Sequence, residues 1–276
     1  MVVGELFGND MNSIGSYVNN KQFDMAFNFQ LASSIISSAN SRSASYTTRA
    51  LELSTKVLDD SEFAPFLTNH DQDRVMSELR GDVNKAKVAA SLLLTSPGTP
   101  FIYYGEEIGM QGRKPDENIR RPMQWSDAKG AGFTTGKPWR APDTDFALVN
   151  VAAQMNDPDS LFAHYRALIQ LRNAHPALRG GNYLTVGTDA DRLFASLRIS
   201  EEEAALVLVN TGEESISNFT LKADKTGLAP GNYVLISLFG SPLTLELSIN
   251  ESGGFDLKTG SEIPAYQTMI FELKSK

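Results

Sequence analysis

The strongest constraint on the fold is an apolar run, Phe63 to Leu67, that stops abruptly at a polar cluster, Thr68 to Arg74. A buried strand has this pattern where it emerges at the rim of a barrel or sheet. In α/β folds the catalytic side chains lie at the carboxyl ends of such strands. The tripeptide Asn69-His70-Asp71 alone is weak evidence, because turns and helix N-caps also favour Asn and Asp. The rest of the chain must decide between a site and a turn.

Strand-like and helix-like segments alternate through the first part of the chain. We expect strands at 2–6, 25–29, 63–67 and 100–104, and helices at 33–40, 47–58, 83–95 and 160–173. Such alternation predicts parallel βα units. Four units fit in this length, whereas a complete eight-unit barrel needs about 250 residues. The pattern therefore predicts half of a barrel or a small open sheet.

The segment from Gly105 to Asn156 has little periodicity, and it contains both tryptophans of the chain. A long structureless stretch inside a compact domain is usually a functional loop. We expect it on the same rim as Glu5 and Asp71, since all three follow predicted strands.

The pattern of apolar and polar residues changes after Gly180-Gly181. Short alternating apolar segments separated by turn residues follow, at 183–186, 192–199, 204–209, 217–221, 233–238, 243–247 and 268–273. This spacing predicts an antiparallel β-sandwich. We therefore predict two domains: residues 1–178, an α/β catalytic part, and residues 179–276, a β-sandwich.

Composition excludes several classes of function. A net charge of -8 argues against a nucleic-acid partner, which would select a basic face. The chain has no cysteine, so disulfides and thiolate metal sites are excluded, and its three histidines are far apart in sequence. No apolar run approaches the length needed to span a membrane. Met1 to Glu5 is not a signal peptide and is expected to enter a strand directly.

Two carboxylates, Glu5 and Asp71, are expected at the ends of different parallel strands, near loops rich in aromatic residues and arginine. This arrangement suits glycoside hydrolysis, which needs a proton donor for the leaving oxygen and a carboxylate against the positively charged sugar ring. The reaction needs no cofactor.

Five segments carry a resemblance to the carboxyl-terminal part of the α-amylase family, glycoside hydrolase family 13. Val3-Gly4-Glu5 and Phe66 to Asp71 are similar to the family's third and fourth signature regions, on barrel strands five and seven. Gly98 to Met110 resembles strand eight and its loop. Ile119 to Trp125 and Ala131 to Trp139 resemble a loop of the oligosaccharide-acting branches. The resemblance implies the carboxyl-terminal half of a (β/α)8 barrel, strands five to eight, followed by the β-sandwich.

The resemblance also implies roles for individual residues. Glu5 would be the general acid/base, and Asp71 the second carboxylate, which grips sugar hydroxyls and stabilises the transition state. Asn69 and His70 would bind substrate beside the scissile bond. The family's nucleophilic Asp lies on strand four, outside this sequence, so the chain alone is expected to be inactive. The family's common calcium site draws on absent segments, and no metal or cofactor is predicted.

The aromatic residues of the long loop have two interpretations. The aromatic side chains of Trp125, Phe133 and Trp139 either stack on pyranose rings or simply pin the loop. Arg74 is expected to pair with a nearby acid and hold the loop, while Arg120 and Arg121 are expected to orient neighbouring carboxylates.

The prediction is thus a retaining hydrolase of α-linked glucan oligo- or polysaccharides, of the α-amylase type. The alternatives are an α-glucosidase, oligo-1,6-glucosidase or trehalose synthase of the same family, and a non-catalytic carbohydrate-binding relative. The abrupt start favours an incomplete product of a longer gene, so the missing amino-terminal half of the barrel is the expected protein partner. Neither a nucleic-acid nor a membrane partner is expected.

Overall fold

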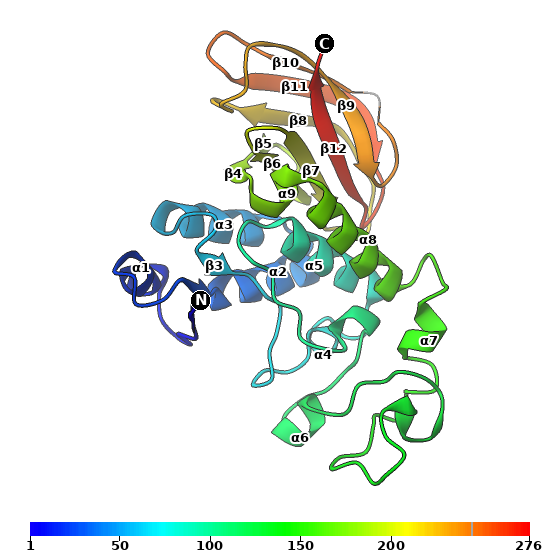
Figure 1. Ribbon diagram of the computed structural model, residues 1–276. Coiled ribbons are helices and arrows are strands. Elements are labelled where there is room, and N and C mark those ends of the chain that lie inside the picture. Colours follow the sequence, from blue (N-terminus) through cyan, green and yellow to red (C-terminus); the bar gives the residue numbers. More distant parts are fainter. Residues whose placement is uncertain (244) are drawn as a thin grey trace.

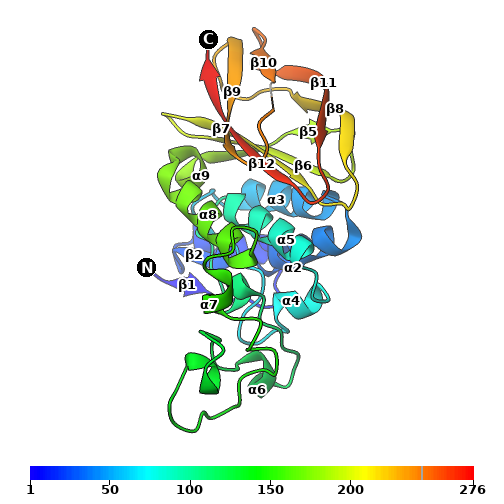
Figure 2. The same cartoon turned by 90° about the vertical axis from the view of Figure 1, so that its right-hand side faces the viewer.

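The computed structural model describes residues 1–243 and 245–276 in three layers (Figure 1). Antiparallel sheets form one end of the molecule, a layer of helices lies in the middle, and the long loop with α6 and α7 forms the other end. Figure 2 shows the same order of layers after a quarter turn.

The amino-terminal sheet has three short parallel strands in the order β1-β2-β3. They are β1 (Val3–Gly4), β2 (Met25–Phe27) and β3 (Phe63–Ala64). The strand predicted at 100–104 does not form a regular ladder, which corrects that expectation. Its segment still runs beside β3, because Thr99 N donates to Phe63 O (3.0 Å) and Phe101 N to Pro65 O (2.8 Å). Pro65 and Pro100 have no N–H, so two of the donors that a ladder needs are missing.

Helices cover this sheet and separate it from the carboxyl-terminal sheets (Figure 1). Their bounds are α1 Met11–Asn19, α2 Phe29–Ser41, α3 Ser45–Val57, α4 Val75–Glu78, α5 Val83–Thr95, α8 Leu161–Ala174 and α9 Pro176–Gly180. Helix α2 begins at Phe29 rather than at the predicted Ser33, because the Asn28 side chain accepts from Leu31 N and caps it. Helix α5 has the predicted bounds, with Asp82 as its cap.

The long loop contains only short helical turns. They are η1 Glu106–Ile108, α6 Asp116–Ile119, η2 Lys129–Gly132 and α7 Val151–Gln154. Buried side chains hold the loop backbone: Ile119 and Gln124 are fully buried, and the Gln124 amide donates to Val149 O. The loop is therefore an ordered part of the structure, although its sequence has little periodicity.

The carboxyl-terminal strands form two antiparallel sheets, as predicted. The six-stranded sheet has the order β10-β9-β12-β7-β6-β4 and the three-stranded sheet β11-β8-β5. The bounds are β4 Asn182–Thr185, β5 Gly187–Thr188, β6 Leu193–Ile199, β7 Ala204–Asn210, β8 Ile216–Ala223, β9 Gly231–Phe239, β10 Glu246–Ile249, β11 Phe255–Ile263 and β12 Thr268–Ser275.

Three strands depart from the sequence prediction. Strand β5, Gly187–Thr188, was not predicted. The strand expected at 243–247 includes residue 244, which lies outside the described residues, and β10 begins at Glu246. Strand β11 was not predicted, because only Phe255, Thr259 and Ile263 along it are buried. Burial at every fourth residue gives no clear alternation in the sequence.

Strand β7 shows how the sheets attach to the helices. Every residue of Ala204–Asn210 is buried. Val207 and Val209 belong to the core cluster shared with the helices, whereas Leu206 and Leu208 belong to the core between the two sheets. Both faces of this strand are therefore covered. The division into residues 1–178 and 179–276 stays a prediction.

Two buried arginines fix the carboxyl end of α5. Arg172 Nη1 donates to Leu94 O (2.7 Å) and Ser96 O (2.8 Å), and Arg198 Nη1 donates to Thr95 O (2.8 Å). These bonds satisfy carbonyls that have no partner inside the helix. Burial lowers the pKa of Arg172 to about 9. These bonds fix the carboxyl end of α5, from which the chain continues into the segment at 98–104.

Candidate active site

Glu5 and Asp71 lie on one rim of the parallel sheet, because they follow β1 and β3 in the same direction. The side chain of Asn69 joins them. Its Nδ2 donates to Glu5 Oε1 (3.2 Å), and its Oδ1 accepts from the backbone N–H of Asp71 (2.9 Å). Two acids 66 positions apart in the printed sequence are therefore connected through one amide group.

His70 and Asp71 are held from the loop by Arg120. Arg120 Nη2 donates to Asp71 Oδ1 (2.6 Å), and its Nε donates to His70 O (2.8 Å). The His70 ring lies 3.5 Å from Asp71 Oδ2, and both side chains are about half exposed, 55% and 53%. The same guanidinium also pairs with Asp116 Oδ2 (2.8 Å). The expectation that Arg120 orients a carboxylate is confirmed, and the two acids of the site face solvent.

Arg74 has a different partner from the expected one. It is buried, its Nη1 donates to Tyr104 O (2.7 Å), and its guanidinium lies 4.6 Å and 4.8 Å from the ring centres of Tyr103 and Tyr104. Among residues 1–243 and 245–276 no acid forms a direct ion pair with Arg74, so the expected pair is replaced by aromatic faces and a carbonyl. Burial lowers the pKa of Arg74, and the nearby carboxylates of Glu106 and Glu107 act in the opposite direction. Arg74 does hold the loop.

Glu106 is a buried acid that the sequence reasoning did not single out. Its side chain is 2% exposed, and Oε1 accepts from the Tyr165 hydroxyl (2.7 Å). Burial raises the pKa of Glu106 to about 8, and the neighbouring carboxylate of Glu107 acts in the same direction. The available signal was similar to that at Asp71: an apolar run that ends in polar residues including acids, here Gly105-Glu106-Glu107.

The raised pKa of Glu106 predicts a loss of stability as the pH rises from about 4.5 to about 8. Between about 4.5, the value for an exposed carboxyl, and about 8, the folded chain binds a proton that the unfolded chain has released. The stabilisation is complete below pH 4.5 and is lost as the pH rises toward 8. Glu106→Gln keeps an acceptor for Tyr165 and cannot ionise. We expect it to gain about 3 kcal/mol of unfolding free energy over the wild type between pH 5 and 7.5.

Urea unfolding of both proteins across this pH range measures the difference. Glu117→Gln is the matched control, since Glu117 is an exposed acid of the same loop and its replacement should leave the pH dependence of the wild type unchanged. Parallel stability curves for Glu106→Gln and the wild type would contradict the prediction.

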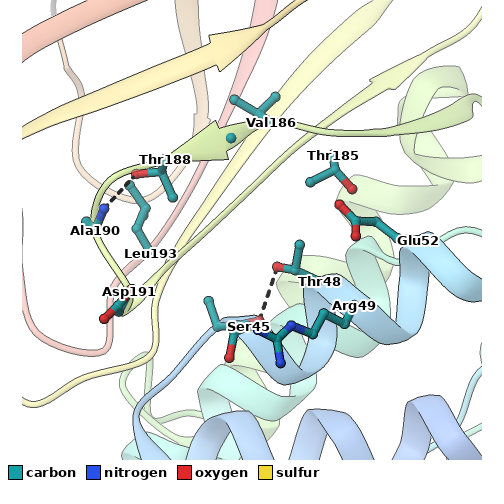
Figure 3. A pocket seen from close by; sticks show the side chains of 12 residues that line it. Ser45, Thr48, Arg49, Glu52, Thr185, Val186, Thr188, Ala190, Asp191 and Leu193 are labelled. Atoms are coloured by element: carbon teal, nitrogen blue, oxygen red, sulfur yellow. Dashed lines mark hydrogen bonds between the residues drawn. The ribbon is translucent and has the colours of Figure 1, made fainter.

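A hollow of about 280 Å³ lies away from this rim, between α3 and the segment containing β4 and β5 (Figure 3). Ser45, Thr48, Arg49 and Glu52 line it on the helix side, facing Thr188 and other residues of the β part. No aromatic ring is among its lining residues, so a sugar bound there would have no stacking surface.

Within 1–243 and 245–276, no three His, Asp or Glu side chains are grouped closely enough to hold a metal ion. In the same part of the chain, no helix has the length and apolar character needed to cross a bilayer.

Comparisons with known proteins agree with this geometry. Residues 1–181 match the family model of the α-amylase catalytic domain. The chain is 34% identical over 225 residues to α-amylase 3 of Dictyoglomus thermophilum, covering 79% of this chain and 44% of that protein. It is 29% identical over 286 residues to an oligo-1,6-glucosidase of Heyndrickxia coagulans, covering 84% of this chain and 51% of that protein.

Solved structures extend the similarity to the whole chain. The α-amylase of H. orenii is 32% identical with a TM-score of 0.77, covering 99% of this chain and 53% of that one. The trehalulose synthase MutB of Pseudomonas mesoacidophila MX-45 is 25% identical with a TM-score of 0.74, covering 99% and 55%. The chain thus spans about half the length of these relatives. The predicted fold, the carboxyl-terminal half of a (β/α)8 barrel followed by an antiparallel β-sandwich, is confirmed.

Proposed function

The chain belongs to the α-amylase family of glycoside hydrolases, and from this premise we propose that it supplies half of the active site of a retaining enzyme for α-linked glucans. The observation that carries the proposal is the Asn69 side chain, which joins Glu5 and Asp71 on one rim. Catalytic groups that come from the ends of different strands are typical of barrel enzymes.

Each site residue has a proposed role. Glu5 gives a proton to the leaving glycosidic oxygen and later takes one from water, as general acid and base. Asp71, fixed by Arg120, binds sugar hydroxyls and stabilises the positive charge of the transition state. Asn69 and His70 bind the sugar beside the scissile bond.

The nucleophile of the retaining reaction is proposed to come from sequence beyond these 276 residues. Within residues 1–243 and 245–276 the sheet order is β1-β2-β3, so strand β1 has a neighbour on one side only. An edge strand of this kind presents free N–H and C=O groups that further strands can pair with. The other half of a barrel is therefore the proposed protein partner.

The α-amylase type is our first assignment, because α-amylase 3 matches at 34% identity over 79% of the chain. The oligo-1,6-glucosidase type is the second candidate, since such a relative matches over 84% at 29% identity. Release of glucose from maltotriose compared with isomaltose separates the two activities.

The test compares the purified chain alone with the chain produced together with the amino-terminal part of the H. orenii α-amylase. We expect no hydrolysis of maltotriose by the chain alone, because no covalent glycosyl-enzyme intermediate can form without the nucleophile. We expect hydrolysis by the completed protein. Turnover by the chain alone would contradict the proposed division of the site, and a completed, folded protein that binds glucan without cleaving it would favour a non-catalytic relative.

A further inference from the structure

Two adjacent tyrosines, Tyr103 and Tyr104, hold the main chain on both sides of Arg120. The Tyr103 hydroxyl donates to Ile119 O (3.1 Å), and the Tyr104 hydroxyl donates to Arg121 O (2.7 Å). One of these carbonyls lies one residue before Arg120 and the other one residue after it. The two hydroxyls therefore fix the backbone from which the Arg120 side chain extends.

The local chain is too short to hold Arg120 in place by itself. Helix α6, Asp116–Ile119, has four residues and ends at Arg120, whose backbone N–H donates to Asp116 O (3.0 Å). An isolated helix of one turn is unstable in water. The buried side chain of Ile119 anchors this turn, but the direction of the Arg120 side chain depends on the peptide groups around it. The tyrosine hydroxyls bind those groups.

The rings of the two tyrosines are themselves supported from below. They meet edge to face with their centroids 4.8 Å apart, and the Arg74 guanidinium lies 4.6 Å and 4.8 Å from the two ring centres. Arg74 is buried, and its Nη1 donates to Tyr104 O (2.7 Å). Rings held by a cation and by each other have few orientations left, so each hydroxyl points in one direction.

These contacts form a closed circuit that begins and ends at Asp71. Three residues after Asp71 the chain reaches Arg74, which supports the tyrosine rings, and the tyrosine hydroxyls hold the backbone around Arg120. Arg120 Nη2 then donates to Asp71 Oδ1 (2.6 Å), and its Nε donates to His70 O (2.8 Å). The position of Asp71 is therefore fixed twice, through its own backbone and through its carboxylate.

We propose that Tyr103 and Tyr104 are positioning residues, whose hydroxyls aim the Arg120 guanidinium at the carboxylate of Asp71. Each hydroxyl donates its proton to a main-chain carbonyl, so neither needs to touch the sugar. The inference rests on the proposed function and deepens it, because the orientation of Asp71 matters for catalysis only if Asp71 acts on the sugar ring. A carboxylate that is fixed before the substrate binds needs no reorganisation in the transition state.

Nuclear magnetic resonance of the purified chain tests the positioning without any substrate. The Arg120 Nε–H signal is the arginine signal that disappears in Arg120→Lys. In the double variant Tyr103→Phe/Tyr104→Phe, which keeps both rings, this signal should shift, and its exchange with water should be about tenfold faster or more, because fewer bonds hold the segment. The Nε–H signal of Arg198, a buried donor to Gly181 O, should stay unchanged and shows that the fold is intact.

Activity of the completed protein tests the consequence for catalysis. Tyr103→Phe and Tyr104→Phe should each lower kcat/KM for maltotriose about fivefold, roughly what one neutral hydrogen bond contributes. In an Arg120→Ala background the same changes should cost less than about 1.5-fold, because no guanidinium is left to position. A role of the hydroxyls in the fold alone would give equal losses in both backgrounds.

Tyr46→Phe is the matched control, because Tyr46 is an exposed tyrosine (49%) on α3, outside the circuit. It should change neither the Arg120 signal nor kcat/KM. An unchanged Arg120 signal in the double variant would overturn the inference, and so would equal losses with and without Arg120. A completed protein that does not hydrolyse glucan would refute the proposed function instead, and the resonance measurement on the chain alone would still decide the positioning.

Discussion

Replacing Glu5 by Gln is expected to lower the kcat of the completed enzyme for maltotriose about 1,000-fold, the range attributed to general acid–base catalysis. Glutamine keeps an oxygen that accepts the Asn69 Nδ2 bond found at Glu5 Oε1 (3.2 Å), so the local geometry should persist. It cannot give a proton to the leaving oxygen. The loss should appear in kcat with little change in KM, because the missing interaction is made mainly in the transition state.

A substrate with a good leaving group shows whether Glu5→Gln is slow because it lacks the proton donor or because it is misfolded. Such a substrate needs little proton donation, so Glu5→Gln should recover part of the rate when an activated aryl glucoside replaces maltotriose. Glu117→Gln removes an exposed acid from the nearby loop and should leave both rates unchanged. Full activity of Glu5→Gln on maltotriose would remove Glu5 from the mechanism.

The sequence was sufficient for the elements that have strong local signals. Helix α5 has the predicted bounds because Asp82 caps its start and Ser96-Pro97-Gly98 stops it. Most strands of the six-stranded sheet alternate or run apolar over most of their length and were predicted, whereas β10 begins at Glu246 instead of the predicted 243. Strand β11 has too few buried positions to be recognised, and the segment at 100–104 depends on prolines that remove ladder donors.

The position of Glu5 and Asp71 on one rim could also be predicted from local signals in the sequence. An apolar run that ends in acids indicates a strand end, and parallel strands bring their carboxyl ends to one edge. The partner of Arg74 could not be predicted from the sequence. The choice between an acid and two aromatic faces depends on the geometry of side chains from distant segments. The burial of Glu106 against Tyr165 likewise arises from packing of α8, 59 positions along the chain.

Gly98→Ala is expected to destabilise the fold strongly. Gly98 has φ of +86°, a left-handed conformation, and a Cβ there would overlap the carbonyl oxygen of Phe63. The left-handed conformation costs an alanine about 1 kcal/mol. Moving the segment away from β3 also breaks the bonds from Thr99 N to Phe63 O and from Phe101 N to Pro65 O, at about 1–3 kcal/mol each if the groups stay buried. The expected loss of unfolding free energy is about 4 kcal/mol.

Gly180→Ala is the control, because Gly180 ends α9 and a Cβ there would meet no atom within 4 Å. Its unfolding free energy in urea should stay within about 0.5 kcal/mol of the wild type. If Gly98→Ala unfolded at the same urea concentration as Gly180→Ala, the close approach at Phe63 would not restrict this position.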